Sequence, residues 1–305
     1  MTQEVWDDPK EERLEDCERV DLKSACTYVI PLRIESADRM RNVITTLTYL
    51  LKNFDARVIV KEFDKESVFN SSVRPQLETV LYKQEYENLD HVFEQTDEFV
   101  FHRTRLINDM VEMVDTPIVC NHDCDILLPY ESHFLACKYI VEGYLPPNSD
   151  SGTLPEPVKC VYPYGYGMFQ YQVKATDNLV SDFINTNFNF KTFEGHMRKW
   201  DAKFGFCQFF DTEEYKRLGL ENENFVSYGY EDDERYHRFN NCSNVIRLNN
   251  FIFHLEHSRT QNSWFTNPHI ESNRALWEKM QYWEKDKIEA YYEDVDYMKK
   301  RRGQK

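Results

Sequence analysis

Three features that would classify a chain quickly are missing here. The eight cysteines form neither a Cys-x-x-Cys pair nor a dense framework, which argues against a zinc finger and against a disulfide-stapled domain. No apolar run approaches the length of a membrane span. Basic residues are outnumbered by acidic ones, 37 against 53, and the resulting formal charge of −16 repels DNA, RNA and anionic lipid. We therefore expect no nucleic-acid partner and no membrane span.

What is present suits a globular domain. The 305 residues can form one large α/β domain or two small ones, and 41% hydrophobic with 15% aromatic content can build a sizeable core. Residues 1–8 show no basic stretch followed by an apolar one, as a secretory leader would. Several cysteines lie in apolar runs, where a reduced thiol acts as a small hydrophobe. We expect a reduced, cytoplasmic protein, with a Golgi enzyme trimmed to its soluble domain as the open alternative.

Strand and helix patterns alternate near the start of the chain. Thr27–Pro31 reads as a strand, and Ser36 is a good N-cap for a helix whose apolar side chains fall on one face. Arg57–Val60 is the next strand, and this order implies a parallel βαβ unit. Farther along we expect short strands at 99–101 and 118–120, a helix at 105–114, a strand at 245–253 and a charged closing helix from 274 to about 301.

Two carboxylates follow the apolar run Ile118–Cys120. Asp123 and Asp125 would lie at the end of that short buried strand, at the sheet edge where ligands bind in open α/β folds. Hard carboxylate oxygens suit Mn²⁺ or Mg²⁺, and substrate phosphates usually complete the shell of such an ion. The expected ligand is therefore a nucleotide diphosphate. An isolated Asp-x-Asp is also common on surface loops, so the pair needs support from elsewhere in the chain.

One supporting segment is Tyr228-Gly229-Tyr230 followed by four acids, Glu231–Glu234. Acids are also favoured at a plain helix start. That explanation leaves two aromatic rings around a glycine unaccounted for. Rings on a glycine turn make a platform for a sugar face, and a neighbouring carboxylate can deprotonate an acceptor hydroxyl.

Another supporting segment ends an apolar strand with two histidines, His254 and His257. A neutral imidazole is a common metal ligand, although a lone histidine in such a place is more often structural. Residues three apart on a strand point to opposite faces, so both can bind one ion only if the strand ends between them. His257 is the stronger candidate.

Taken in order, these segments resemble the inverting, metal-dependent glycosyltransferases of the GT-A fold. The likeness is greatest to β-1,4-galactosyltransferases and to the galactosaminyl-transferring domains of bacterial chondroitin polymerases, and it runs from about Thr27 to Pro268. Pro31 and Arg33 resemble a Pro-x-Arg segment that touches the nucleotide. Arg103 lies in a stretch similar to one whose arginine also contacts the nucleotide.

The resemblance implies a role for each remaining candidate. Asp123 and Asp125 look like the family's Asp-x-Asp, with the last residue on Mn²⁺ and the first facing the ribose or assisting the metal shell. His254 and His257 resemble the first and fourth residues of Met-x-x-His-Ser-Arg, which reach the metal. The segment 228–233 resembles Trp-Gly-Gly-Glu-Asp-Asp, which has a sugar-binding Glu followed by the catalytic base. By this likeness Tyr228 and Gly229 line the donor site, Glu231 binds the sugar and Asp232 is the base.

Four positions depart from the family's pattern. Phe206 stands where a second glycine is usual, which would narrow the sugar pocket, and Tyr230 also replaces a glycine. Tyr228 replaces a tryptophan. His254 replaces a methionine, which should favour metal binding if the chain turns after it. The disulfides and membrane anchor of the animal Golgi enzymes have no evident counterpart, which favours a cytosolic member from a bacterium or virus.

The resemblance therefore implies a single α/β GT-A domain, Rossmann-like, with a mixed, mainly parallel sheet flanked by helices. We place it at residues 26–272, between a charged N-terminal extension at 1–25 and a C-terminal helical extension at 273–305. We expect the extensions to be solvated helices rather than docking sites. A Pro/Ser/Gly-rich insertion at 145–157 would be a substrate lid or a surface loop.

The implied activity is inverting, Mn²⁺- or Mg²⁺-dependent transfer of a hexose or N-acetylhexosamine from a UDP-sugar to a glycan or small-molecule hydroxyl. Two other classes stay open. A metal-dependent phosphoester hydrolase could use the same acids, although it would leave the Tyr-Gly-Tyr turn unexplained. A non-catalytic carbohydrate-binding protein would have no need of the ordered set of arginine, acids and histidines.

Overall fold

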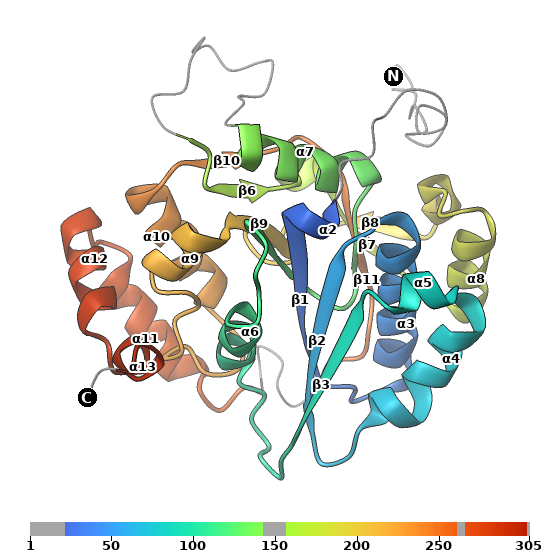
Figure 1. Cartoon of the computed structure of the whole chain (residues 1–305), viewed down its shortest axis with the longest axis horizontal. Helices are drawn as coiled ribbons and strands as arrows, with labels where there is room; N and C mark the ends of the chain where they lie inside the picture. The colour runs from blue at the N-terminus through green and yellow to red at the C-terminus, as the bar shows by residue number, and fades with distance from the viewer. Residues whose placement is uncertain (1–21, 143–156, 261–265, 304–305) are drawn as a thin grey trace.

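The structure is a computed structural model that describes residues 22–142, 157–260 and 266–303. Its main sheet has the strand order β10-β6-β9-β4-β1-β2-β3, and a smaller sheet has the order β5-β11-β7-β8. In the view of Figure 1, helices α3, α4, α5 and α8 lie on one side of strands β1–β3, and α9 to α13 lie on the other. The main strands are β1 (Cys26–Leu32), β2 (Arg57–Asp64), β3 (Leu89–Gln95), β4 (Ile118–His122), β6 (Cys160–Tyr162), β9 (Cys207–Asp211) and β10 (Val245–Arg247).

The smaller sheet consists of β5 (Ile126–Leu127), β7 (Gln170–Val173), β8 (Met197–Lys199) and β11 (Ile252–Leu255). The first helices are α2 (Leu22–Ala25), α3 (Ala37–Asn53), α4 (Arg74–Val80), α5 (Lys83–Tyr86), α6 (Arg103–Val111) and α7 (Tyr130–Glu142). The later helices are α8 (Asp177–Asn185), α9 (Thr212–Arg217), α10 (Glu231–Cys242), α11 (Ile270–Met280), α12 (Lys285–Asp294) and α13 (Asp296–Arg301).

The expected βαβ unit at the start of the domain is confirmed. Strand β1 is buried at every position and pairs in parallel with both β2 and β4. Such strands read as unbroken apolar runs because both of their faces are covered. Ser36 caps α3 by accepting a hydrogen bond from the Arg39 amide. Strand β9 runs antiparallel between β4 and β6, so the sheet is mixed and mainly parallel, as expected.

Two strand predictions were wrong. The third strand is β3, at Leu89–Gln95, and residues 99–101 form no strand. Every residue of β3 is at least partly exposed and several are charged, so the strand shows no apolar run. The stretch 245–253 is not one strand, because β10 pairs with β6 in the main sheet and β11 pairs with β7 and β5 in the smaller one. The chain crosses between the two sheets at this point.

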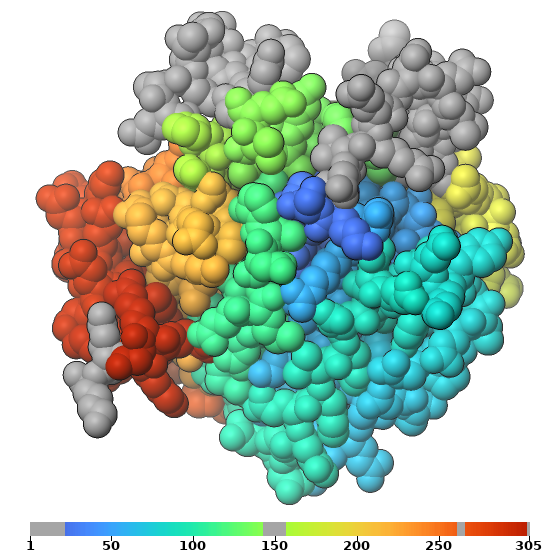
Figure 2. All heavy atoms as spheres, in the orientation of Figure 1, coloured from blue at the N-terminus to red at the C-terminus, as the bar shows by residue number. Residues whose placement is uncertain are grey.

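The C-terminal segment is three helices rather than the expected one, and it is packed rather than solvated. The breaks fall near Glu284 and Val295, which both have extended backbone. The Tyr292 hydroxyl donates to Glu234 Oε1 of α10 at 2.6 Å. Arg301 contacts three carboxylates, among them Asp109 Oδ1 on α6 at 2.7 Å. Figure 2 shows the red atoms of these helices lying against the orange and gold ones of α9 and α10.

Several sequence expectations concern segments that the structure does not describe. The N-terminal extension lies outside the described residues up to 21, and the insertion at 145–157 does so up to 156. Within the described ranges every cysteine is a buried free thiol. Each helix described is too short or too polar to cross a membrane.

Candidate active site

Pairing between the two short strands β5 and β11 creates the centre of the site. Asp125 directly precedes β5, and its carbonyl accepts a hydrogen bond from the Leu255 amide at 2.8 Å. In the same antiparallel ladder His254 lies opposite Ile126. The Asp125 side chain, almost fully buried, therefore comes to lie beside the histidines that end β11.

The three residues predicted to bind the metal are brought together. His257 Nε2 is 3.1 Å from Asp125 Oδ2, and His254 Nε2 is 3.8 Å from Asp125 Oδ1. One ligand atom from each residue lies within 4.8 Å of the others. Strand β11 ends at Leu255, which meets the condition for both histidines to face one point. The cluster is a candidate metal site with one carboxylate and two imidazoles.

Burial and the charges of its members shift the pKa values of this cluster. Burial would raise the pKa of Asp125, but His254 and His257 hold it well below its usual range, so the carboxylate is charged. Burial lowers the pKa of His254, which keeps that imidazole neutral near neutral pH. Burial would lower the pKa of His257, but its hydrogen bond with Asp125 raises it, so a metal ion would replace a proton on Nε2. The Nδ1 atom of His257 is 2.9 Å from the Ser258 carbonyl.

The first turns of α3 hold the bend that carries His257. The Asp38 carboxylate accepts hydrogen bonds from both the amide and the hydroxyl of Ser258. The Asn42 side chain donates to the Leu255 carbonyl at 2.9 Å. Burial would raise the pKa of Asp38, but the hydrogen bonds from Ser258 and Ser36 lower it well below its usual range. This part of α3 acts as a support around the metal ligands.

Arg39 also belongs to the cluster, and sequence reasoning missed it. Its Nη1 is 3.9 Å from Asp125 Oδ2, and its Nη2 is 3.2 Å from His257 Nδ1. A basic residue in the first turn of a helix opposes the helix dipole. That misplaced charge was the signal available in the sequence.

Asp123, the first acid of the Asp-x-Asp pair, faces a different partner. It accepts a hydrogen bond from Arg103 Nη2 at 2.6 Å, and its amide donates to the Phe206 carbonyl. Burial raises the pKa of Asp123, and Arg103 opposes that shift. Arg103 Nη1 is buried and has no hydrogen-bond partner among the described residues. Arg103 therefore has an unused donor beside Asp123.

The acidic segment begins helix α10 and lies within the electrostatic reach of Arg103. Glu231 Oε2 accepts a hydrogen bond from the Gly229 amide at 2.6 Å. Burial and the neighbouring Asp232 raise the pKa of Glu231 to about 8. Asp232 is more exposed, at 26% of its side chain, and contacts the fully buried Arg235. Arg235 is the second residue that sequence reasoning missed, because charges on a helix usually mark a solvated face.

Gly205 and Phe206 border both parts of the site. A Cβ atom at position 205 would lie 2.9 Å from Asp232 Oδ2, so any side chain there would push the carboxylate away. Phe206 has a positive φ of 76°, which is unusual for a residue with a side chain, and its ring stacks on His254 with centroids 5.7 Å apart. Tyr230 also has a positive φ, of 71°.

The remaining residues predicted to contact the donor lie in or directly after β1 and in the turn before α10. Pro31 is within β1, opposite Lys61 of β2. Arg33 is buried and donates to the carbonyls of Phe63, Phe99 and Glu98, so its guanidinium shapes the segment before α6. Tyr228 is 46% exposed, and burial of its hydroxyl end together with the charges of Glu231 and Asp232 raises its pKa.

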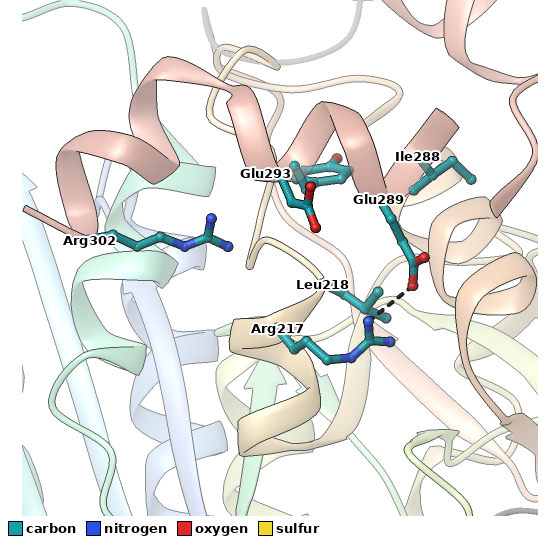
Figure 3. Close-up of a pocket in the computed structure, with 7 residues that line it drawn as sticks. Arg217, Leu218, Ile288, Glu289, Glu293 and Arg302 are labelled. Carbon is teal, nitrogen blue, oxygen red and sulfur yellow. Dashed lines mark hydrogen bonds and ion pairs between the residues drawn. The ribbon is translucent and has the colours of Figure 1, made fainter. Parts of the chain in front are cut away.

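A separate groove lies between α9 and the C-terminal helices (Figure 3). None of the residues that line it belongs to the cluster described above. An ion pair of 3.0 Å between Arg217 and Glu289 crosses it. The full lining is Arg217, Leu218, Ile288, Glu289, Tyr292, Glu293 and Arg302.

Comparisons with known proteins find likeness in structure only. No protein-family model and no curated protein matches the sequence. Among solved structures, the catalytic domain of Drosophila β1,4-galactosyltransferase 7 bound to xylobiose matches with a TM-score of 0.44 and 14% identity, over 86% of this chain and 83% of that one. A mutant of the same enzyme with manganese, UDP-Gal and xylobiose gives 0.41 and 13%, over 76% and 71%.

A third solved structure is the mannosyltransferase of Pyrobaculum calidifontis in complex with GDP-Man and Mn²⁺. It matches with a TM-score of 0.47 and 14% identity, over 94% of this chain and 75% of that one. Likenesses of this size assign no function, so the function has to be inferred from the site itself.

Proposed function

We propose that this protein is an inverting, metal-dependent glycosyltransferase that moves a hexose or N-acetylhexosamine from a UDP-sugar to a hydroxyl of a glycan or small molecule. One observation carries the proposal. Asp125 of the metal cluster is two residues from Asp123, and Asp123 is bonded to Arg103, which also interacts electrostatically with Asp232 and Glu231. A divalent ion and a base at one site are the two parts that such a transfer needs.

The donor set fits Mn²⁺. Two imidazole nitrogens and one carboxylate oxygen suit a first-row divalent ion, and three protein ligands leave positions that phosphate oxygens can complete. Asp125, His254 and His257 would hold the ion. A bound ion of this kind neutralises charge on a departing diphosphate as a Lewis acid.

The chain's own residues account for binding of the nucleotide. The formal charge of −16 would repel a nucleotide diphosphate unless cations were placed locally. Arg103 offers an unused Nη1 donor beside Asp123. A planar guanidinium recognises phosphate and ribose oxygens well. Asp123 would face the ribose while it remains bonded to Arg103.

Sugar binding and proton transfer fall to the start of α10. Glu231 is buried and would orient the donor sugar through its hydroxyls. Asp232 would take the proton of the acceptor hydroxyl while the acceptor oxygen forms its bond to the anomeric carbon. The bond from that carbon to the phosphate oxygen breaks on the opposite face, the electron pair leaves with UDP, and the configuration inverts. Tyr228, exposed beside both acids, offers a ring face to the sugar.

A donor panel tests the proposal directly. The protein would be mixed with Mn²⁺ and with each of several UDP-sugars, and release of UDP would be measured with and without EDTA. A GDP-sugar serves as the control for recognition of the nucleobase. We expect release from one UDP-sugar that EDTA abolishes, since slow hydrolysis often replaces transfer when no acceptor is present. If no UDP-sugar releases UDP and the protein does not bind UDP, the proposal is overturned.

The same assay separates the two other classes. Phosphate release from a simple phosphoester, with no sugar nucleotide present, would indicate a metal-dependent hydrolase. Binding of free glycans without any binding of Mn²⁺ or UDP would indicate a carbohydrate-binding protein.

A further inference from the structure

Arg39 occupies an unusual position for a positive charge. It lies in the first turn of α3, with 19% of its side chain exposed, among three groups that would hold a divalent cation. Its Nη1 is 3.9 Å from Asp125 Oδ2, and its Nη2 is 3.2 Å from His257 Nδ1. Its Nε is buried without a hydrogen-bond partner among the described residues. The guanidinium is therefore close to the site, but not all of its hydrogen-bond donors have partners there.

A divalent ion at the cluster would change the surroundings of Arg39. Asp125 is the carboxylate nearest to its guanidinium, and the ion would take that charge. The other acid in its electrostatic surroundings, Glu35, is exposed to solvent. A largely buried charge that loses its partner is costly, and like charges repel across a few ångströms. Ion binding without a compensating anion is therefore opposed by Arg39.

A diphosphate would supply that anion. Phosphate oxygens complete the coordination of such ions, so a bound nucleotide would bring negative charge to the place next to Arg39. The planar guanidinium matches phosphate through paired hydrogen bonds. Of the other candidate arginines, Arg33 is already engaged by three backbone carbonyls, and Arg103 is bonded to Asp123 and keeps one donor, Nη1, for the nucleotide.

We propose that Arg39 binds the diphosphate of the donor and, before the nucleotide arrives, competes with the metal ion for Asp125. The proposal rests on the proposed function, in that the anion is a nucleotide diphosphate. In the free protein Arg39 lowers the affinity of the site for the ion. In the loaded protein it donates to a phosphate oxygen and holds the charge that develops on the departing nucleotide. Metal and nucleotide then strengthen each other's binding. The phosphate offsets the repulsion between Arg39 and the ion, and the ion frees Arg39 from Asp125.

The test compares the variant Arg39→Met with the wild type in two measurements. The first is the affinity for Mn²⁺ alone, from titration calorimetry or from the free Mn²⁺ signal in electron paramagnetic resonance. The second is the affinity for UDP at saturating Mn²⁺. We expect Mn²⁺ to bind on the order of tenfold more tightly to the variant. We expect UDP to bind roughly tenfold to a hundredfold more weakly.

These opposite signs distinguish the proposal from a structural role. A variant with a loosened site would lose affinity for both ligands, and that result would overturn the proposal. Arg39→Lys keeps the charge and should restore the wild-type affinity for Mn²⁺, with a smaller recovery for UDP. Lys52→Met is the matched control, because Lys52 lies on the same helix and pairs with Glu85 at 3.4 Å. It should leave UDP affinity unchanged.

The binding measurements distinguish failure of this proposal from failure of the proposed function. Unchanged UDP affinity in Arg39→Met, with wild-type binding intact, would remove Arg39 from the site and leave the function standing. A wild-type protein that binds Mn²⁺ but no UDP would overturn the function itself.

Discussion

Asp38 and Ser258 are joined by two hydrogen bonds although 220 residues separate them. Both the amide and the hydroxyl of Ser258 donate to Asp38 Oδ2, each at 2.6 Å. Ser258 directly follows His257, so the pair fixes the bend that aims one candidate metal ligand. The N-terminal turn of α3 thus determines how the chain leaves β11.

Asp38→Asn should weaken Mn²⁺ binding, because an amide cannot accept both bonds with the strength of a carboxylate. Groups that orient a metal ligand typically change affinity about 10- to 100-fold when they are lost. Calorimetric titration of the variant with Mn²⁺ measures the effect. Asp177→Asn, at the exposed start of α8, is the control. Equal Mn²⁺ affinities in the Asp38 variant and the wild type would show that the bend holds without this pair.

Asp232→Asn should lower kcat by about 10²- to 10⁴-fold, which is the usual contribution of general-base assistance. Affinity for UDP and Mn²⁺ should stay at the wild-type level, because Asp232 lies outside the metal cluster. Asp233→Asn is the matched control at the adjacent acid. Turnover of the Asp232 variant at the wild-type rate would assign the base to another group.

Gly205→Ala should also reduce kcat, by moving Asp232 rather than by removing it. The added Cβ would lie 2.9 Å from Asp232 Oδ2, closer than such atoms normally approach. Steady-state kinetics on the variant, with Mn²⁺ affinity measured alongside, isolate the effect. Full activity would mean that the carboxylate can move without harm and that its position is not critical.

Glu231→Gln should make the protein more stable in alkaline solution. Burial and Asp232 raise the pKa of Glu231 to about 8, so the folded chain keeps a proton that the unfolded chain releases near about pH 4. The free energy of unfolding then falls as pH rises from about 4 to about 8. The glutamine variant lacks this loss, so its Tm should exceed that of the wild type at pH 8, and the difference should vanish near pH 4. A constant difference across that range would contradict the shifted pKa.

Tyr292→Phe should lower the free energy of unfolding by about 1–2 kcal/mol. The Tyr292 side chain is buried, and its hydroxyl ties α12 to Glu234 of α10. Denaturant titration measures the loss. Tyr282→Phe is the control, because Tyr282 is 82% exposed. If both variants unfold alike, this hydrogen bond contributes little to the stability of the domain.

Much of the framework could be predicted because it depends on local patterns. The apolar run of β1 and the capped helix α3, with its apolar side chains on one face, are both recognisable in the sequence. The three candidate metal ligands lie at or near strand ends that the sequence patterns also indicate. Strand β3 was not predicted because an edge strand with half-exposed, charged positions has no apolar run. The place of Arg235 in the site was not predicted for a different reason. Its complete burial depends on Glu221 and Asp232, which meet it only in the folded chain.

Phe206 and Tyr230 both keep a left-handed backbone where the resembled motifs carry glycine. Such a conformation costs about 1–3 kcal/mol in a residue with a side chain, and neighbouring structure must hold it in place. Because neighbouring structure already holds this conformation, glycine at either position would relieve backbone strain rather than create it. A single exchange with glycine could widen the pocket without rerouting the backbone, and the reverse exchange could narrow it. Exchange at these two positions is therefore a simple route to a site of different width.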